Sequence, residues 1–247
     1  MKEKPILFSA EMVRAILDGR KTQTRRVIKP QPDSPVVALG FWQSDADGSW
    51  AWRYQTPIHD GVLTWNNCRL LGKNGKCPYG TPGDHLWVCE TWGLVTPESA
   101  GERWHNLALK RPTCLHPESN PVDGIARAIY RADGKWEFAT GYQKWRPSIF
   151  MPRWASRITL EIISVRVERV QDISKQDAYA EGIGDPEYED EIAGPCLAGI
   201  AGGCGACQNC DSVFSFKLLW NEINAKRDYS WNKNPWVWVI EFKRLET

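Results

Sequence analysis

Four cysteines near the C-terminal end of the chain have a spacing that suits a metal ion. Cys204, Cys207 and Cys210 follow the pattern C-x2-C-x2-C, and Cys196 lies eight residues earlier. Four thiolates can hold Zn²⁺ tetrahedrally, so these residues predict a structural zinc site. An iron–sulfur cluster or a reduced, flexible Cys/Gly loop are the alternatives. The other four cysteines are expected to be free thiols: Cys68, Cys77, Cys89 and Cys114.

A second stretch mixes cations with aromatic rings. Residues 142–170 carry six Lys/Arg and only two Asp/Glu. Trp145, Arg153 and Trp154 lie in this stretch, where cations could bind phosphates and rings could stack on bases. These three side chains are therefore candidate contacts to a nucleoside substrate or to single-stranded RNA. The alternative is the edge of a Trp-rich core, with arginines that extend their charged ends to solvent.

The remaining pattern predicts strands with a few short helices between them. Ser9 can cap a helix over residues 10–18, and Ser174 with Asp177 forms a capping-box pattern that opens a second helix. A third, amphipathic helix is expected after Asp211 or Ser212. Strands are expected over 6–8, 22–28, 85–92, 157–170 and 236–242, with hairpins at 41–54 and at 125–138. This order favours one mixed α+β domain over residues 1–247, with insertions at about 34–80 and 184–210.

Four segments together resemble the ASCH family, a branch of the PUA-like barrels. They are G-R-K-T-Q-T-R-R at 19–26, G-D-H-L-W-V at 83–88, A-Y-A-E-G-I at 178–183 and W-V-I-E-F-K-R-L at 238–245. The segments occur in the family's order, and the whole chain resembles the longer ASCH proteins that prophages encode. The resemblance implies a PUA-like mixed β-barrel with flanking short helices and large loop or hairpin insertions.

The resemblance also implies a function at a nucleobase. The family contains RNA-associated modules and small bacterial enzymes that hydrolyse the acyl amide of N4-acetylcytidine. The positions that match their catalytic lysine, threonine and glutamate are Lys21, Thr24 and Glu181, and Arg26 matches a basic residue beside the threonine. An amidohydrolase of N4-acylcytosine nucleosides is the leading expectation. A non-catalytic reader of RNA or a modified base and a ribonuclease that uses Lys21 with Glu181 are the alternatives.

These residue types fit amide hydrolysis without a catalytic cofactor. Thr24 could attack the acyl carbon, or it could orient the substrate while water attacks. Lys21 could act as the base if burial or a neighbouring cation, Arg25 or Arg26, favours its neutral form. Glu181 could protonate the leaving nitrogen, and Arg26 could stabilise the oxyanion. Because residues three apart face opposite sides of a strand, Lys21 must precede the regular part of the strand that carries Thr24.

Composition limits the class of protein. The chain has 247 residues, 42% of them hydrophobic, and a net charge of +1, which excludes a general polycationic coat for nucleic acid. Most of the 14 tryptophans are expected to fill the core. No apolar run approaches the length of a membrane span, and no signal-peptide pattern is present, so a cytoplasmic protein without a membrane partner is expected.

Overall fold

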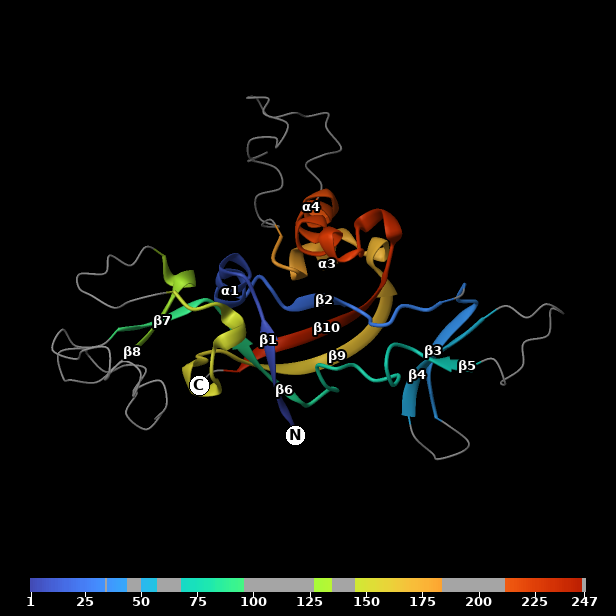
Figure 1. Cartoon of the computed structure of the whole chain (residues 1–247), viewed down its shortest axis with the longest axis horizontal. Coiled ribbons are helices and arrows are strands. Elements are labelled where there is room, and N and C mark those ends of the chain that lie inside the picture. Colours follow the sequence, from blue (N-terminus) through green and yellow to red (C-terminus); the bar gives the residue numbers. More distant parts are fainter. Residues whose placement is uncertain are drawn as a thin grey trace, which may run out of the picture. The chain divides into compact units, whose positions relative to one another are not determined.

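Strands outnumber helices in the structure, a computed structural model that describes residues 1–33, 35–43, 50–56, 68–95, 127–134, 145–183 and 212–245. The predicted α+β class is thereby confirmed (Figure 1). The helices are α1 (Ala10–Leu17), α3 (Lys175–Ala180) and α4 (Ser212–Asn224). The strands are β1 (Glu3–Leu7), β2 (Gln23–Val27), β3 (Ala38–Gln43), β4 (Trp50–Gln55), β5 (Cys68–Leu70), β6 (His85–Cys89), β7 (Trp92–Val95), β8 (Arg127–Tyr130), β9 (Thr159–Arg169) and β10 (Trp236–Leu245).

The chain forms two compact units, and each is built from separate segments. The first unit contains Met1–Thr22, Gly83–Ile162 and Phe242–Thr247. The second contains Gln23–Pro82 and Ile163–Glu241. The chain therefore changes unit within β9 and again within β10.

The first unit contains a sheet in which β1 runs parallel to β6 and β6 runs antiparallel to the first residues of β9. Its register places Ile6 beside Val88 and Leu86 beside Leu160. All four side chains are almost completely buried, and their burial supplies much of the hydrophobic stabilisation of this sheet. The hydroxyl of Ser9 accepts a hydrogen bond from the N–H of Met12 at the start of α1, as the sequence predicted.

One strand prediction in the first unit is wrong at its end. The expected strand over 85–92 is divided into β6 and β7, which belong to different sheets. The division occurs at Glu90, a buried carboxylate that Arg157 binds, because an ion pair interrupts the apolar strand pattern there. Strand β8 pairs with β7, and the second strand of the hairpin expected at 125–138 lies outside the described residues, so that hairpin stays a prediction.

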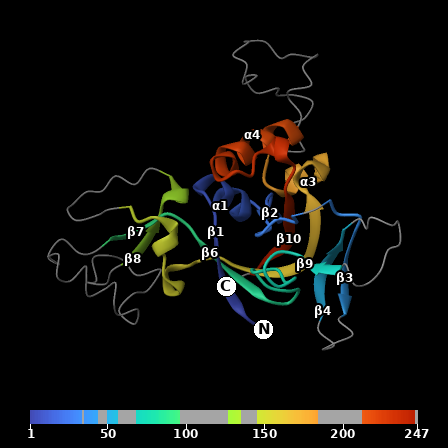
Figure 2. The same cartoon turned by 45° about the vertical axis from the view of Figure 1, so that its right-hand side comes forward.

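The second unit contains the strand order β9-β10-β2, covered by helices. Strand β2 pairs antiparallel with β10, so that Arg25 lies beside Val239. Figures 1 and 2 both show α3 and α4 on the same side of β2 and β10. A cluster of buried side chains fills the space beneath the helices: Val170, Ile173, Ala178, Phe216, Trp220, Trp231, Val237 and Val239.

A separate three-stranded sheet in the second unit has the order β3-β4-β5. All of its pairs are antiparallel, and Phe41 of β3 lies beside Trp52 of β4. The predicted hairpin at 41–54 is confirmed in this pairing. The sheet lies within the segment 34–80, which the sequence indicated as an insertion.

Helix α3 begins as the sequence predicted. Ser174 accepts a hydrogen bond from the N–H of Asp177, while the Asp177 carboxylate accepts one from the N–H of Ser174. This reciprocal capping box satisfies two N–H groups at the helix start. Among the described residues, none of the helices has both the length and the apolar character needed to cross a bilayer.

Candidate functional site

Strand β2 presents its polar residues alternately on two faces. Thr24 and Arg26 share one face, while Gln23 and Arg25 share the other. The contacts agree with this alternation, because the side chains of Gln23 and Arg25 both interact with residues of one polar network, Gln23 with Arg166 and Arg25 with Glu168. Thr24 and Arg25 are 3% and 5% exposed. The strand therefore places two buried polar residues on opposite sides of the sheet.

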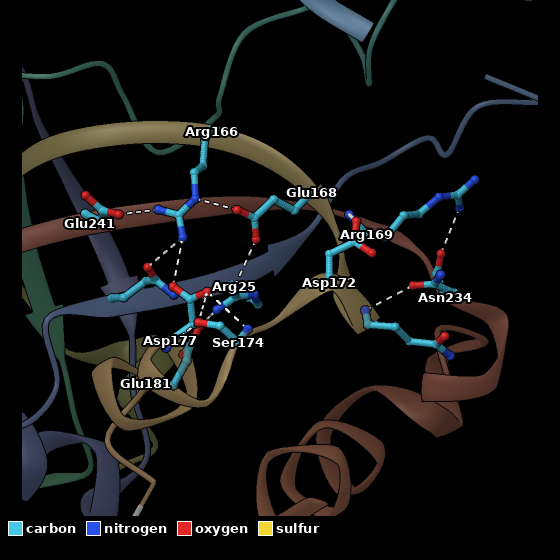
Figure 3. Close-up of polar contacts among 12 residues, drawn as sticks. Arg25, Arg166, Glu168, Arg169, Asp172, Ser174, Asp177, Glu181, Asn234 and Glu241 are labelled. Carbon is cyan, nitrogen blue, oxygen red and sulfur yellow. Dashed lines mark hydrogen bonds and ion pairs between the residues drawn. The ribbon is translucent and has the colours of Figure 1, made fainter. Parts of the chain in front are cut away.

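Arg25 is the centre of a buried ion-pair network, which Figure 3 shows. Its Nη2 lies 2.9 Å from an oxygen of Glu168 and 3.3 Å from an oxygen of Asp177. Its Nη1 lies 3.5 Å from Oε1 of Glu181, and its guanidinium lies 5.9 Å from the ring of Phe216. No part of the Arg25 side chain is exposed. The guanidinium thus gathers three carboxylates that come from β9 and from helix α3 and its C-cap.

Arg166 joins the same network from β9. It pairs with the second oxygen of Glu168 and, at 3.0 Å, with the second oxygen of Asp177. It also forms a close ion pair with Glu241 of β10. Glu168 and Asp177 therefore each bridge the two arginines, so that the network fixes α3 against the strands (Figure 3).

The Asp177 carboxylate takes part both in the capping box of α3 and in the ion pairs with Arg25 and Arg166. Burial by itself raises the pKa of its carboxyl, but the hydrogen bonds from Ser174 and the charge of Arg25 outweigh burial, so the pKa lies below its ordinary value. The ionised form is thus the form that the fold stabilises.

This shift predicts a loss of stability in acid. Because the folded state lowers the pKa of Asp177 below its ordinary value of 3.8, its contribution is complete above that value and is lost as the pH falls through the folded-state pKa. Asp177→Asn should cost about 1 kcal/mol at pH 7, since the carboxyl is partly solvated. Denaturant unfolding should show the two proteins converging as the pH falls toward 3. A matched Asp228→Asn variant should behave as the wild type, and a pH-independent gap for Asp177→Asn would contradict the assignment.

Glu181 caps the C-terminal end of α3. Its N–H donates to the carbonyl of Asp177, and Gly182 follows with φ of +85°, a conformation that glycine adopts without strain. The Glu181 side chain is only 4% exposed. The helix end and the Arg25 contact together hold this carboxylate in one place.

Arg26 lies on the same face of β2 as Thr24. Its guanidinium is 5.8 Å from the ring of Tyr79. Burial lowers the pKa of Arg26, and interactions with Tyr79 and Glu181 partly offset that effect. Arg26 is therefore a partly buried cation that interacts electrostatically with the Glu181 carboxylate.

Lys21 belongs to the first unit and lies after the turn that ends α1. Gly19 has φ of +78°, and the N–H of Lys21 donates to the carbonyl of Ala15 at 2.9 Å. The side chain is buried, with Nζ 5.6 Å from the centre of the Phe8 ring. Lys21 thus precedes the regular strand, as the proposed chemistry requires.

The other predicted substrate contacts also belong to the first unit. Arg153 forms a forked ion pair with Glu3, at 3.0 and 3.2 Å. Trp154 packs edge-on against Trp92, with ring centres 5.7 Å apart, and Trp145 lies near Gly93. Arg153 and Trp154 therefore have partners within their own unit, as the core-edge alternative predicts.

Comparison with known proteins gives no relative for this chain. No family model, curated protein or solved structure matches it. The function must therefore be argued from the residues themselves and from the motif resemblance.

The predicted zinc ligands, Cys196, Cys204, Cys207 and Cys210, lie outside the described residues, so the zinc site stays a prediction. Among the cysteines that the structure describes, Cys77 and Cys89 are buried and form no disulfide. Burial raises the pKa of the Cys89 thiol to about 11, which makes it an inert core residue rather than a nucleophile.

Sequence reasoning did not identify the partners of Arg25. Glu168, Asp177 and Arg166 were not recognised as parts of one site. The signal that could have identified this site was the spacing of polar residues on two strands. Arg166 and Glu168 are two residues apart and share one face of β9. Gln23 and Arg25 share one face of β2 in the same way. Charged residues of opposite sign at such positions on neighbouring strands can meet, but the sequence does not show which strands are neighbours.

Proposed function

We propose that the protein hydrolyses the acyl amide of an N4-acylated cytosine nucleoside or a related modified base. The observation that carries the proposal is the burial of the three residues at the motif positions. Lys21, Thr24 and Glu181 are 2%, 3% and 5% exposed. Burial of polar groups is costly, so an amine, a hydroxyl and a carboxyl that are all withdrawn from water are candidates for a functional role.

Chain connectivity supports the pairing of the amine with the hydroxyl. Lys21 and Thr24 are three residues apart, so their Cα atoms lie within about 11 Å of each other. Lys21 stands outside β2 and Thr24 inside it, which removes the opposite-face restriction of a continuous strand.

The proposed reaction adds water across the amide bond. A hydroxyl oxygen, from water or first from Thr24, forms a bond to the acyl carbon, and Lys21 accepts the proton that this oxygen loses. The bond between the acyl carbon and N4 then breaks, and N4 takes a proton from the protonated form of Glu181. Where Thr24 attacked, water then hydrolyses the acyl–threonine ester, and the proton that this water loses returns to the Thr24 oxygen through Lys21. In both routes the proton that Lys21 first took passes to Glu181, which restores both groups. The products are a carboxylic acid and the cytosine nucleoside.

The two arginines beside Thr24 receive different roles in this proposal. Arg25 already binds three carboxylates, so we assign it to hold Glu181 in position. Arg26 shares the face of Thr24 and is the better candidate to stabilise the oxyanion. A PUA-like barrel with the ASCH topology forms part of the same proposal, and it rests on the motif resemblance.

The test is incubation of the full chain with N4-acetylcytidine, with cytidine release followed by chromatography. Lys21→Met keeps the length and apolar part of the side chain but removes the amine, and it should lower kcat by about a hundredfold or more. Glu181→Gln should have a comparable effect. Lys226→Met, a change at an exposed lysine, should leave turnover unchanged, and circular dichroism would show that each variant is folded.

Three outcomes would redirect the proposal. Binding of the nucleoside without turnover would indicate a reader of modified bases. Cleavage of RNA that disappears in Lys21→Met would indicate a ribonuclease. Turnover that survives in folded Lys21→Met would remove Lys21 from the mechanism.

A further inference from the structure

Tyr79, near the end of the insertion that the sequence predicted at 34–80, lies beside Arg26 of β2. The Arg26 guanidinium is 5.8 Å from the centre of the Tyr79 ring. Both side chains are partly buried. A cation–π contact gains strength when water is excluded from it, so this pair should interact more strongly than an exposed one.

The electrostatic surroundings of Arg26 include the same ring. Burial lowers the pKa of Arg26, and two groups oppose that effect, Tyr79 and, more weakly, Glu181. Arg26 is therefore close both to a ring supplied by the insertion and to the carboxylate at the C-cap of α3. All three residues belong to the second unit.

The segment that leads to Tyr79 is fastened to β4. The N–H of Leu71 donates to the carbonyl of Trp52, and the N–H of Trp52 donates to the carbonyl of Gly75. Gly75 has φ of +65°, and a Cβ there would lie 2.7 Å from the carbonyl oxygen of Trp52. Only glycine permits this close approach, which holds residues 71–75 against the strand.

Strand β4 and residues 71–75 in turn contact the strands on either side of Arg26. Trp52 packs edge-on against Trp238, with ring centres 6.3 Å apart, and Trp238 is the cross-strand neighbour of Arg26. A Cβ on Gly72 would lie 3.2 Å from Cγ2 of Ile28, which directly follows β2. Because cross-strand neighbours share a face, the chain that leads to Tyr79 is fixed on the face that carries Arg26.

We propose that Tyr79 is a positioning residue whose ring holds the Arg26 guanidinium on the Thr24 face of β2, where the acyl oxygen of the substrate becomes negatively charged. The inference rests on the proposed function, in which Arg26 stabilises that oxyanion. An arginine side chain has several rotatable bonds, and a ring that fixes it reduces the entropy lost when the guanidinium binds. The insertion thereby supports a group that β2 carries.

The first test is the steady-state kinetics of the full chain with N4-acetylcytidine. Tyr79→Leu should lower kcat by about threefold to thirtyfold with KM nearly unchanged, because the contact acts through the transition state. Tyr79→Phe keeps the ring and should retain most of kcat. Tyr229→Leu removes the ring that lies 5.3 Å from Nζ of Lys29 in the same unit, and this matched control should leave kcat unchanged.

Coupling to Arg26 separates positioning from packing. Arg26→Met should lower kcat by about a hundredfold or more, as loss of an oxyanion donor does. In this background the further change Tyr79→Leu should have no effect on kcat, because the group that Tyr79 positions is already absent. A loss of the same size in both backgrounds would show that Tyr79 acts only through packing and would overturn the proposal.

Binding measurements give a readout that does not require turnover. In Lys21→Met, isothermal titration calorimetry should show tighter binding of N4-acetylcytidine than of cytidine, because Arg26 also donates to the uncharged acyl oxygen. Tyr79→Leu in this background should reduce that preference by about threefold or more. Circular dichroism would show that each variant is folded.

The two readouts distinguish a failure of this inference from a failure of the proposed hydrolysis. Turnover that Tyr79→Leu leaves unchanged would reject the role of Tyr79 and keep the hydrolase. A wild type without turnover, whose preference for the acetylated nucleoside depends on Tyr79, would keep that role in a reader of modified bases. A wild type with neither turnover nor such a preference would overturn both.

Discussion

Replacing Arg25 by methionine is expected to lower the free energy of unfolding by about 3 to 5 kcal/mol, the usual cost of breaking a buried ion pair. Methionine keeps an unbranched side chain of similar length but removes the guanidinium, so the loss should come mainly from the charge. Three carboxylates, those of Glu168, Asp177 and Glu181, would lose their shared cation. Arg166 still pairs with Glu168 and Asp177, which leaves Glu181 as the carboxylate most affected.

Denaturant unfolding at pH 7 measures this effect, and repetition in acid tests its cause. Protonation of the carboxylates relieves their unpaired charge, so the deficit of Arg25→Met should shrink as the pH falls toward 4. The double variant Arg25→Met, Glu181→Gln should recover part of the loss. Arg69→Met breaks an exposed ion pair in the same unit and should leave stability nearly unchanged. A loss for Arg25→Met that is no larger than that of Arg69→Met would show that the network is energetically neutral.

The second large effect is expected at Arg157 in the first unit. Its guanidinium binds both oxygens of Glu90, at 2.9 and 3.1 Å, and lies 2.6 Å from an oxygen of Asp133. It also lies over the ring of Tyr130, 4.0 Å from the ring centre. Glu90 is 1% exposed, so Arg157→Met would leave a buried carboxylate without its guanidinium and should cost about 3 kcal/mol or more.

The pKa of the buried carboxyl at this site is shifted in the opposite direction from that of Asp177. Burial raises the pKa of Glu90, and the hydrogen bond and charge of Arg157 only partly oppose that effect. A raised carboxyl pKa means that stability falls as the pH rises through it, and removal of Arg157 should raise the pKa further. The deficit of Arg157→Met should therefore be larger at pH 8 than at pH 5, as measured by denaturant unfolding.

Two variants control for this interpretation. Arg153→Met breaks the exposed pair with Glu3 in the same unit and should have little effect. Arg157→Met combined with Glu90→Leu removes both buried charges and should be more stable than Arg157→Met alone. A double variant that is less stable than the single one would show that the cost arises from packing rather than from charge.

Features that depend on neighbours in the sequence could be predicted. Ser9 and Ser174 identified the starts of α1 and α3, because a capping side chain acts on N–H groups two or three residues away. Gly182 identified the end of α3 for the same local reason. The alternation of Thr24 and Arg25 followed from the two-residue period of a strand.

Features that depend on distant partners could not be predicted. Arg25 meets Glu168 and Glu181 across 143 and 156 residues, and nothing near Arg25 in the sequence specifies either partner. The pairing of β8 with β7 was missed because no pattern near either strand specifies its partner. Asp133 binds Arg157, a contact that no local pattern shows.

The interleaving of the two units along the chain has a consequence for synthesis. The first unit takes residues from both ends of the described chain, and the second depends on β10 for the strand beside β2. Neither can be complete on a nascent chain until residues 236–245 have left the ribosome. We therefore expect the emerging polypeptide to keep β2 and β9, which both neighbour β10, without that strand until the end of translation, which makes it a client for chaperones that shield such strands.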